Sequence, residues 1–301
     1  MFIYNLGSLN IDYVYHVPHF VRSGETVASR EMQIFPGGKG LNQSVALGRA
    51  GASVRHGGLI NNNDKWLVNV LQHSNVDTSY IQTVSVPSGH AIVQVDSSGQ
   101  NSILLFAGAN HCFAREYIES VLADAKKNDI LLIQNEINHL ELIFEIAHEK
   151  EMQIAFNPSP FDKGILDLPL AYVKWWICNE IEGNELSGKR DALDIVDSLL
   201  QKFPESNILL TLGKDGCIFK NASLILRHPS YKVKAVDTTA AGDTFTGYFL
   251  AMIARGEEVG KALQIASFAA SLAVSREGAS SSIPFLEEVE CKEVQYECNK
   301  R

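Results

Sequence analysis

The sequence predicts an α/β fold in which a mostly parallel sheet is covered by helices on both faces. Short, nearly continuous apolar runs rich in β-branched residues recur along the chain, as is typical of parallel strands buried on both sides. Amphipathic segments lie between these runs, with apolar residues at i, i+3, i+4 and i+7. Strands that alternate with helices in this order form right-handed βαβ units, so the sheet is expected to be flanked by helical layers.

The elements are expected in a regular order along the chain. The strand runs are residues 2–7, 54–60, 129–134, 153–157, 175–178 and 207–212. A helix at 138–150 is indicated by one apolar face, formed by Leu140, Ile143, Phe144 and Ala147. A second helix at 191–202 repeats this pattern, and short strands are expected from 217 to 236. Two further helices, at 243–254 and 257–275, complete the series.

Two stretches, residues 26–35 and 90–106, break this rhythm because no helical segment separates them from their neighbours. The second contains Asp96-Ser97-Ser98-Gly99, a turn sequence between alternating residues that predicts a hairpin. We expect a small antiparallel sheet at one edge of the main sheet. These lid strands are assigned to about residues 12–36 and 88–107 of a single domain that spans 1–301.

The composition is that of a globular protein and excludes several classes of function. The chain has 301 residues, 46% of them hydrophobic, and 26 basic against 35 acidic residues give a net charge of −9. An acidic protein is poorly suited to a phosphate backbone, so no nucleic-acid partner is expected.

The cysteines and the apolar stretches bear on location. The five cysteines are odd in number and form no C-x-x-C pair, which favours reduced thiols in the cytoplasm. The first fifteen residues lack the basic start of a signal peptide. The longest uncharged apolar stretch, 244–254, is shorter than the ~20 residues of a membrane span, so no membrane association is expected.

A glycine-rich motif at 37–43, Gly-Gly-Lys-Gly-Leu-Asn-Gln, precedes a helical run that ends near Ala50. Glycines at a helix entry let backbone N–H groups approach a ligand closely, and Lys39 and Asn42 add donors. The spacing is neither that of a Walker A motif nor that of a dinucleotide-binding fingerprint. An ordinary glycine-rich turn is the alternative at this point.

A second motif, at 236–245, follows a β-rich run at 231–236 and opens a long helix. The small residues Ala240, Ala241 and Gly242 leave the N–H groups of the first helical turn accessible, and such a terminus attracts anions. Asp243 lies in the same turn, where it is either a helix-start residue or a base beside a phosphate site. Phosphoryl transfer needs this pairing of an anion cradle with a carboxylate that orients the attacking hydroxyl.

Polar residues follow two of the expected strands. Asn179 and Glu182 come directly after the strand at 175–178, at the edge where open α/β sheets bind ligands. Glu182 is a candidate to hold Mg²⁺ through water, because Mg²⁺ keeps much of its hydration shell. Asn10 and Asp12 follow the first strand and alternate with apolar neighbours, so both can face one side and bind sugar hydroxyls. A solvated helix start and a polar strand end are the respective alternatives.

With these motifs in hand, the chain resembles the ribokinase-like PfkB family of carbohydrate kinases, and within it the ribokinase members most. The resemblance runs from about residue 4 to residue 284. Segments 37–43 and 237–245 resemble the two family signatures, with Ala240 where many relatives have glycine. Segments 107–110, 179–182, 211–216 and 276–279 match further stretches in the family's order. The resemblance implies a ribokinase-like three-layer fold with a small β-sheet lid.

The resemblance also implies a chemistry for several positions. Asp243 is similar to the family's catalytic base, and Ala240, Ala241 and Gly242 resemble its anion hole. The positions that match the family's sugar site are Asn10, Asp12, Gly38, Lys39, Asn42, Glu136 and Asp243. Together they imply transfer of the γ-phosphoryl group of ATP to a primary hydroxyl of a small sugar, with ribose or a related pentose favoured.

Other positions match the nucleotide and ion sites of the family. Those expected at ATP are Asn179, Thr211, Gly213, Gly216, Gly242 and Ser267. Mg²⁺ is expected near Glu182. An activating K⁺ is expected at Asp237, Thr239, Ala273, Arg276, Gly278 and Ser282, partly through backbone carbonyls. The lid implies a homodimer in which the lids of two chains meet.

Several departures and alternatives bear on the substrate. Pro36 restricts the backbone that enters the sugar site, and His90 and Phe106 lie in the lid, where specificity is set. A nucleoside or pseudouridine kinase of the same family, and a non-catalytic sugar-binding regulator on this fold, are the alternatives. The intact Asp243 disfavours the regulator. The absence of G-x-G-x-x-G after the first strand disfavours a nicotinamide-dependent oxidoreductase.

Overall fold

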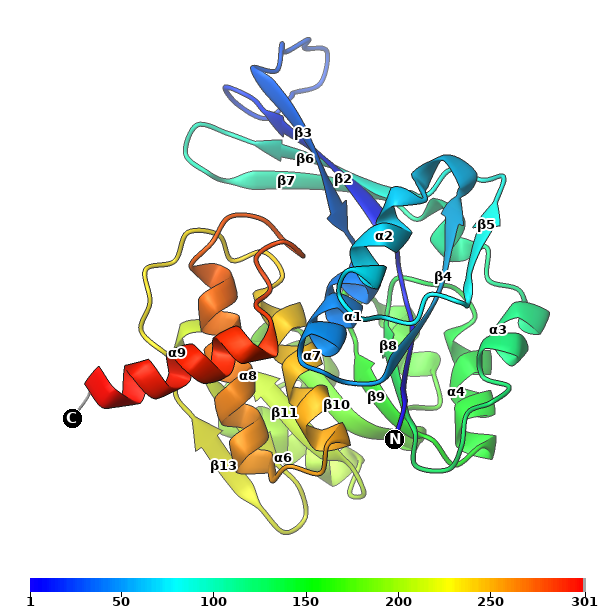
Figure 1. The fold of residues 1–301 in the computed structure, drawn as a ribbon, viewed down its shortest axis with the longest axis vertical. Helices are drawn as coiled ribbons and strands as arrows, with labels where there is room; N and C mark the ends of the chain where they lie inside the picture. The colour runs from blue at the N-terminus through cyan, green and yellow to red at the C-terminus, as the bar shows by residue number, and fades with distance from the viewer. Residues whose placement is uncertain (300–301) are drawn as a thin grey trace.

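The structure is a computed structural model that describes residues 1–299, with side chains up to residue 293. Its centre is a nine-stranded sheet (Figure 1). The strands from β11 to β5 are parallel, whereas β12 and β13 form an antiparallel edge. In spatial order they are β13 (Ile225–His228), β12 (Cys217–Lys220), β11 (Asn207–Thr211), β10 (Val173–Asn179), β9 (Gln153–Asn157), β8 (Ile130–Gln134), β1 (Ile3–Leu6), β4 (Val54–Asn61) and β5 (Ile81–Val84).

Helices cover both faces of this sheet and bury two hydrophobic clusters against it. One face carries α1 (Lys39–Arg49), α2 (Trp66–Gln72), α7 (Ala241–Ala254), α8 (Val259–Val274) and α9 (Leu286–Asn299). The other carries α3 (Arg115–Val121), α4 (Leu140–Glu149), α5 (Glu180–Ser187) and α6 (Ala192–Lys202). Short 3-10 turns lie at Asn62–Asp64, Gly108–His111, Lys163–Asp167, Leu170–Tyr172 and Gly213–Asp215. The three-layer architecture predicted from the alternation of runs is confirmed.

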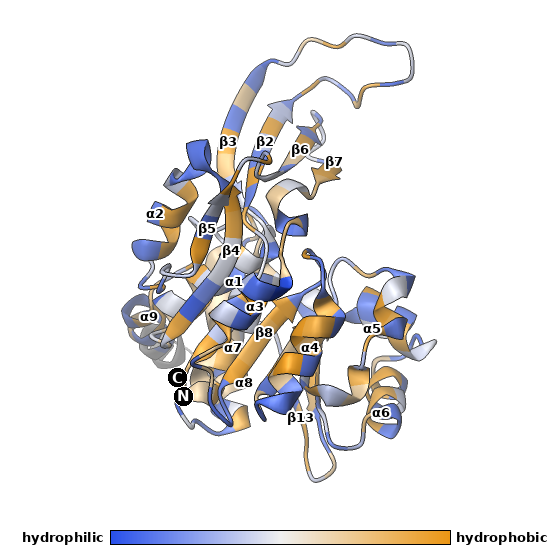
Figure 2. Cartoon of the chain, turned by 90° about the vertical axis from the view of Figure 1, so that its right-hand side faces the viewer, coloured by the Kyte–Doolittle hydropathy of each residue, from blue (hydrophilic) through white to orange (hydrophobic). Residues whose placement is uncertain are grey.

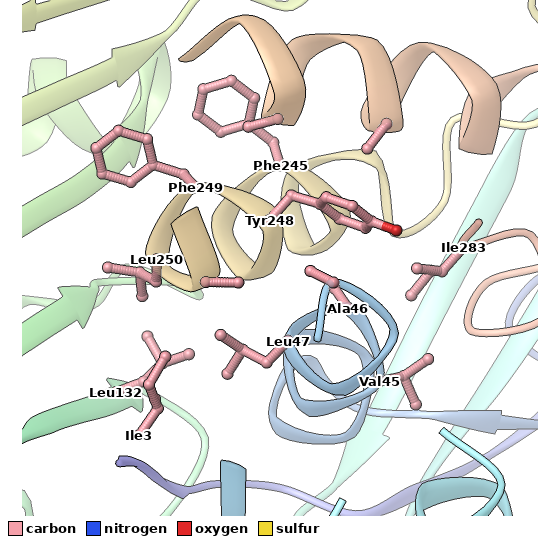
Figure 3. Close-up of a cluster of buried hydrophobic side chains, with 14 of the residues drawn as sticks. Ile3, Val45, Ala46, Leu47, Leu132, Phe245, Tyr248, Phe249, Leu250 and Ile283 are labelled. Carbon is pink, nitrogen blue, oxygen red and sulfur yellow. The ribbon is translucent and has the colours of Figure 1, made fainter. Parts of the chain in front are cut away.

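The hydropathy pattern explains why these elements form. In Figure 2 the strand β8 is almost wholly hydrophobic, whereas α6 mixes hydrophobic and hydrophilic residues, as a helix does when only one side faces the core. Asp191 caps α6 by accepting from the N–H groups of Leu193 and Asp194. Figure 3 shows how α1 and α7 pack on the sheet: Leu47 and Leu250 lie near Ile3 and Leu132 in the buried cluster.

A separate four-stranded sheet stands away from the main sheet, and we call it the lid (Figure 1). Its order is β3 (Glu31–Gly37), β2 (Asn10–His16), β6 (Gly89–Val95) and β7 (Asn101–Phe106). The β6–β7 hairpin predicted from Asp96–Gly99 is present, with Asp96 accepting from the Ser98 and Gln100 N–H groups.

The expectation of an antiparallel sheet on an edge of the main sheet is wrong in two respects. The strands β2 and β6 pair in parallel, because the chain passes through α1 and the β4–β5 region between them. The lid also forms a sheet of its own. The strand expected from residue 26 begins only at Glu31, and the β-rich run at 231–236 forms no strand. The ends of the other predicted runs lie within two residues of those observed, as for β9 and α8.

Within the described residues, none of the helices combines the length and the apolar character needed to cross a bilayer. Cys112, Cys178 and Cys217 are free thiols. Cys298 lies outside the described side chains.

Candidate active site

The carboxyl ends of the parallel strands meet the first turn of α7 at a cavity of about 250 Å³. This is the edge where an open α/β sheet binds ligands. The strands β9, β10 and β11 each end there on a polar residue, Asn157, Asn179 and Thr211 respectively. The remaining lining includes Lys39, Glu182, Thr238, Ala240, Ala241, Gly242 and Asp243. Segments far apart in the sequence are therefore brought to one place, as the two glycine-containing motifs predicted.

Asp243 is buried in this cavity and its carboxylate is held from α1. Its Oδ1 accepts a hydrogen bond from Gln43 Nε2 at 2.8 Å, and its Oδ2 accepts one from Asn42 Nδ2 at 3.2 Å. Asp243 lies in the first turn of α7, where negatively charged side chains are stabilised by the positive end of the helix dipole. A buried carboxylate with fixed orientation and a ligand cavity before it is suited to accept a proton.

The start of α7 has the geometry of an anion site. Ala240 precedes the helix with φ 59° and ψ 11°, a left-handed conformation that turns the chain sharply into the first turn. Gly242 faces open space, since a Cβ built there meets no atom within 4 Å. As the second and third residues of the helix, Gly242 and Asp243 have N–H groups that no helical carbonyl reaches. The N–H of Ala241 donates to the Thr238 carbonyl at 3.3 Å.

Lys39 carries the positive charge of the cavity. Burial works against its ammonium charge, but Asp243, Glu136 and Glu182 together outweigh burial, so the pKa of Lys39 lies above its ordinary value. The lysine therefore stays charged beside the phosphate-sized space at the start of α7. A cation in a low-dielectric cavity stabilises negative charge that develops during a reaction.

The glycine motif is held to the end of β1 through Glu136. The Oε2 of Glu136 accepts the Lys39 N–H at 2.9 Å and also bonds the Ser8 hydroxyl. Gly38 has φ +90°, and a Cβ there would lie 2.9 Å from Ser8 Oγ, so a side chain is disfavoured at this position. The predicted residues Gly38, Lys39 and Glu136 are thus brought together.

Asn10 and Asp12 lie on one face of the lid strand β2. Asn10 Oδ1 accepts from Asn110 Nδ2 at 2.7 Å, and the Asp12 carboxylate lies against Gly37. Burial, reinforced by the nearby Glu136, raises the pKa of Asp12 to about 6. The register pairs Asn10 with Gly37, so these acceptors lie next to the start of the glycine motif.

Asn42 leaves one polar atom without a partner. Its Oδ1 is buried and accepts no hydrogen bond, although its Nδ2 donates to Asp243. A buried acceptor without a donor is costly, and a ligand hydroxyl is one group that can supply the donor. The unsatisfied oxygen lies on the residue that touches Asp243, where a substrate hydroxyl would complete it.

Asn179 and Glu182 form a reciprocal cap on α5. Asn179 Oδ1 accepts the Glu182 N–H at 3.0 Å, and the Glu182 carboxylate accepts the N–H and the Nδ2 of Asn179, each at 3.0 Å. Both residues also line the cavity, and a neighbouring cavity of about 450 Å³ shares them. Each carboxylate oxygen of Glu182 has one protein donor, which leaves acceptor capacity for a bound water.

The other nucleotide positions surround the end of β11. Gly213 and Gly216 have φ +53° and +95° in the turn after Thr211, and a Cβ on Gly216 would lie 2.0 Å from the His228 carbonyl oxygen. Glycine is therefore required at Gly216. Ser267 is buried on α8, where its hydroxyl hydrogen-bonds the Cys217 thiol. Of these positions, Thr211 lines the cavity and the others form its surroundings.

The positions expected for a monovalent ion lie in the loop before α7, the last turn of α8 and the loop that follows α8. Asp237 accepts the Thr239 N–H at 2.9 Å through Oδ1 and the Gly278 N–H at 3.1 Å through Oδ2. The carbonyl of Ala273 accepts the Arg276 N–H, and the Ser282 hydroxyl donates to the Ala279 carbonyl. The Arg276 guanidinium pairs with Glu288 on α9. Asp237 thus joins the loop before α7 to the loop after α8.

Among the described residues, no group of three or more His, Cys, Asp or Glu side chains is arranged to hold a metal ion. Glu182 is the acidic residue that lines both cavities. Mg²⁺ is commonly bound through one or two carboxylates together with water and substrate phosphates, and a single carboxylate fits that pattern.

Four amides that carry the site were given no role from the sequence. Asn5, Gln43, Gln134 and Asn157 form a buried chain of hydrogen bonds behind Asp243. The available signal was a polar residue inside or at the end of an otherwise apolar strand, as with Asn5, Gln134 and Asn157.

A carboxylate beside helix-terminal amides and a partly buried lysine, at the strand ends of an α/β sheet, is an arrangement suited to phosphoryl transfer to a small molecule. The profile of the pfkB family carbohydrate kinases matches residues 2–286. A ribokinase from Haemophilus influenzae is 34% identical over 295 residues, which cover 94% of this chain and 95% of the relative.

Solved structures agree with this assignment. A ribokinase from Thermotoga maritima is 35% identical, with a TM-score of 0.86, and the match covers 96% of this chain and 98% of that one. A ribokinase from Cryptococcus neoformans, in complex with ADP, is 30% identical with a TM-score of 0.85, covering 97% and 99%. The chain belongs to the pfkB family of carbohydrate kinases, and the resemblance to its ribokinase members is confirmed.

Proposed function

We propose that this sugar kinase transfers the γ-phosphoryl group of ATP to a primary hydroxyl of ribose or a closely related pentose. The observation that carries the proposal is the Asp243 carboxylate, held by Asn42 and Gln43 in the first turn of α7 beside Lys39. The similar proteins named ribokinase, one of them solved with ADP, support the choice of sugar and of nucleotide.

In the proposed reaction Asp243 takes the proton of the attacking hydroxyl while that oxygen attacks the γ-phosphorus. The amides of Ala240, Ala241 and Gly242 stabilise the transferring phosphoryl group, and Lys39 neutralises part of its charge. The β–γ bond breaks and ADP leaves. Such a transfer requires little covalent chemistry from the protein, so positioning and electrostatics account for most of the rate.

The sugar would lie between the lid and the glycine motif. Asn10 and Asp12 accept hydroxyl hydrogens from one side, and the unpartnered Asn42 Oδ1 accepts from the other. Gly38, Lys39 and Glu136 complete the pocket at the end of β1. This set of acceptors around one charged donor suits a polyol without a charged group.

ATP would bind over Asn179 and the turn from Thr211 to Gly216, with Gly242 and Ser267 nearby. Three carboxylates act on Lys39, so the cavity carries negative charge of its own. This charge repels a free triphosphate, and binding is favoured when the charge of the triphosphate is reduced. Mg²⁺ bound with ATP supplies that neutralisation, and Glu182 would hold it through water. The acceptor capacity left on Glu182 fits this role.

An activating K⁺ is part of the proposal. The ion would take oxygens from Asp237, Thr239, Ala273, Arg276, Gly278 and Ser282, in the last turn of α8 and the two loops that Asp237 already joins. Because one of these loops leads into α7, ordering it would preorganise the phosphoryl site. Turnover measured in K⁺, Na⁺ and a bulky organic cation at equal ionic strength tests this part, and equal rates would remove it.

We further propose that residues 1–301 act as one unit in a homodimer formed through the lid, and that the protein works in the cytoplasm. The thiols of Cys178 and Cys217, which are buried and free, support a reducing compartment.

The test of the proposed function is Asp243→Asn with a substrate panel. Removing a general base costs about 10²–10⁴ in kcat, while ATP affinity should stay within a few-fold, because the amides that face the phosphates remain. The wild-type protein is assayed for sugar-dependent ADP release with pentoses, hexoses and nucleosides. A kcat of the variant near wild type would make Asp243 a helix-start residue only, and faster turnover of nucleosides would identify a nucleoside kinase.

A further inference from the structure

Gln43 is the residue through which the sheet reaches Asp243. It is fully buried in α1, one residue after Asn42. Its Nε2 donates to Asp243 Oδ1 at 2.8 Å and to Asn157 Oδ1 at 3.1 Å, while its Oε1 accepts from Gln134 Nε2 at 2.7 Å. Both hydrogens of this amide and its oxygen are therefore engaged.

The partners of Gln43 are themselves anchored to the strands. Gln134 Nε2 also donates to Asn5 Oδ1 at 3.1 Å, and Asn157 Nδ2 donates to the Ile177 carbonyl at 2.8 Å. These side chains come from β8, β1 and β9, so three parallel strands fix one amide. The Gln43 amide cannot flip without presenting its oxygen to the Asp243 carboxylate and its nitrogen to the Gln134 nitrogen, which are two repulsive contacts.

This arrangement makes the two oxygens of Asp243 unequal. Oδ1 takes the shorter bond from the anchored amide of Gln43, and Oδ2 takes the longer bond, 3.2 Å, from Asn42. Asn42 Oδ1 is buried without a partner, so a hydroxyl placed beside Asn42 would meet both this oxygen and Asp243 Oδ2. The buried amides thus hold Oδ1 from behind and leave Oδ2 to meet a hydroxyl.

We propose that Gln43 is a positioning residue that sets the orientation of the Asp243 carboxylate, with Gln134, Asn157 and Asn5 as its fixed support. This inference rests on the proposed role of Asp243 as the base. Gln43 does not touch the sugar or ATP in this scheme, so its loss should lower the rate of the chemical step and leave substrate binding intact. A reacting group misplaced by about 1 Å can cost about 10² in rate.

The test is Gln43→Met, which keeps the length of the side chain and removes the amide. We expect kcat to fall about 10- to 100-fold, with KM for ribose and for ATP within about threefold. Gln134→Met removes the donor to Gln43 Oε1 without contacting Asp243, and we expect a smaller fall in kcat in the same direction. Gln153→Met is the matched control: it lies at the opposite end of β9 and loses one bond, from Trp175 Nε1 at 2.9 Å.

The pH profile separates positioning from packing. Without the Gln43 donor, the ionised carboxylate loses a stabilising hydrogen bond, so the acid limb of kcat should move to higher pH. The other charged groups around Asp243 are Lys39 and Glu136, with Glu182 acting on Lys39, and all are unchanged in the variant. A merely structural loss would lower the melting temperature and leave the limb in place.

The outcomes are distinguishable from a failure of the proposed function. Suppose that Asp243→Asn is inactive, whereas Gln43→Met keeps kcat within twofold of wild type and leaves the acid limb of its pH profile in place. The positioning role of Gln43 is then wrong, and the role of Asp243 as the base is retained. If Asp243→Asn is active, the proposed function itself fails. A raised KM with unchanged kcat would instead make Gln43 a binding residue. Should Gln43→Met not fold, an unaffected kcat in Gln134→Met overturns the proposal.

Discussion

Ala240 occupies a backbone conformation that alanine avoids. Its φ of 59° lies in the left-handed region, which costs a residue with a Cβ about 1–2 kcal/mol. The strained residue lies where the chain turns into α7, and it is the first of the three residues whose amides are proposed to bind the phosphoryl group. Glycine adopts this conformation without the cost of a Cβ, so the geometry explains why glycine would suit this position.

Ala240→Gly should therefore stabilise the protein. The relief of about 1–2 kcal/mol is partly offset by the greater freedom of glycine in the unfolded chain, about 0.5–1 kcal/mol, so a small rise in melting temperature is expected by calorimetry. Ala241→Gly is the matched control. Ala241 lies inside α7 with helical geometry, so the same change there should lower the melting temperature. Equal losses in the two variants would mean that Ala240 is unstrained.

At the scale of single residues, the motifs predicted which residues gather around Asp243 but not the buried amides that hold them. Lys39 and the segment 240–243 line one cavity, and Asn42 bonds Asp243 there, because glycines and small residues at helix starts have a direct reason to lie at a ligand. Gln134 and Asn157 are the last residues of β8 and β9 and belong to no motif. Their hydrogen-bond partners depend on which strands are neighbours in the sheet. That information belongs to the tertiary fold.

At the scale of elements, the site depends on the crossing of α1 and α7. A Cβ on Gly247 would lie 2.4 Å from Ala46 Cβ and 2.9 Å from the Gln43 carbonyl oxygen, so the two helices touch backbone to backbone there. Gly247 lies one turn after Asp243. The close approach therefore brings Asn42 and Gln43 to the carboxylate.

Gly247→Ala should separate the helices and slow catalysis. Overpacking of this kind costs about 1–3 kcal/mol, and the shift of α1 should lower kcat about tenfold or more because it moves both donors to Asp243. The control is Gly260→Ala in the first turn of α8, where the nearest atom to a Cβ is 3.9 Å away. It should match wild type in kcat and gain slightly in stability.

The double variant Ala46→Gly with Gly247→Ala tests whether the close contact of the two helices is the cause. It removes the nearest clashing atom, so part of the lost kcat should return. If the single variant keeps full kcat, or if the double variant is as slow as the single one, the close crossing is not what places the donors.

Elements with strong periodicity were predicted well, and those defined by tertiary contacts were not. The strands β8 and β9 and the helices α4 and α6 follow from apolar patterns in the sequence. The short strand β5 has intermediate and exposed residues only, and α9 is rich in acidic residues, so neither carries a clear apolar period. The parallel pairing of β2 with β6 depends on the intervening chain and is invisible to local patterns.

At the scale of the whole molecule, the lid has two different faces. Because side chains alternate along a strand, Asn10 and Asp12 lie on one face of the lid, and Tyr13 lies on the opposite face. The register places the following residues on the Tyr13 face: Met32, Ile34, Ile92, Leu104 and Phe106. They are 36–68% exposed. The face with Asn10 and Asp12 carries the residues proposed to bind the sugar, together with Ile103 and Leu105 on β7, which are 59% and 46% exposed. The Tyr13 face presents the larger number of exposed apolar side chains.

Such a face, on a sheet with open edges at β3 and β7, is a typical site of association. The proposed occupant is the lid of a second copy, because a symmetric pair buries the same residues on both chains. Leu104 is the most exposed of them, at 68%, and lies on the edge strand β7.

Leu104→Glu should convert the dimer to a monomer, since pairing would then bury two carboxylates against apolar side chains. Light scattering at micromolar concentration is the measurement, with wild type expected at twice the chain mass and the variant at one. Leu224→Glu is the control: Leu224 is 41% exposed in the turn between β12 and β13, on the main sheet rather than the lid, and its substitution should leave the dimer intact. A monomeric wild type would refute the lid dimer, and a variant that stays dimeric would place the interface on another surface.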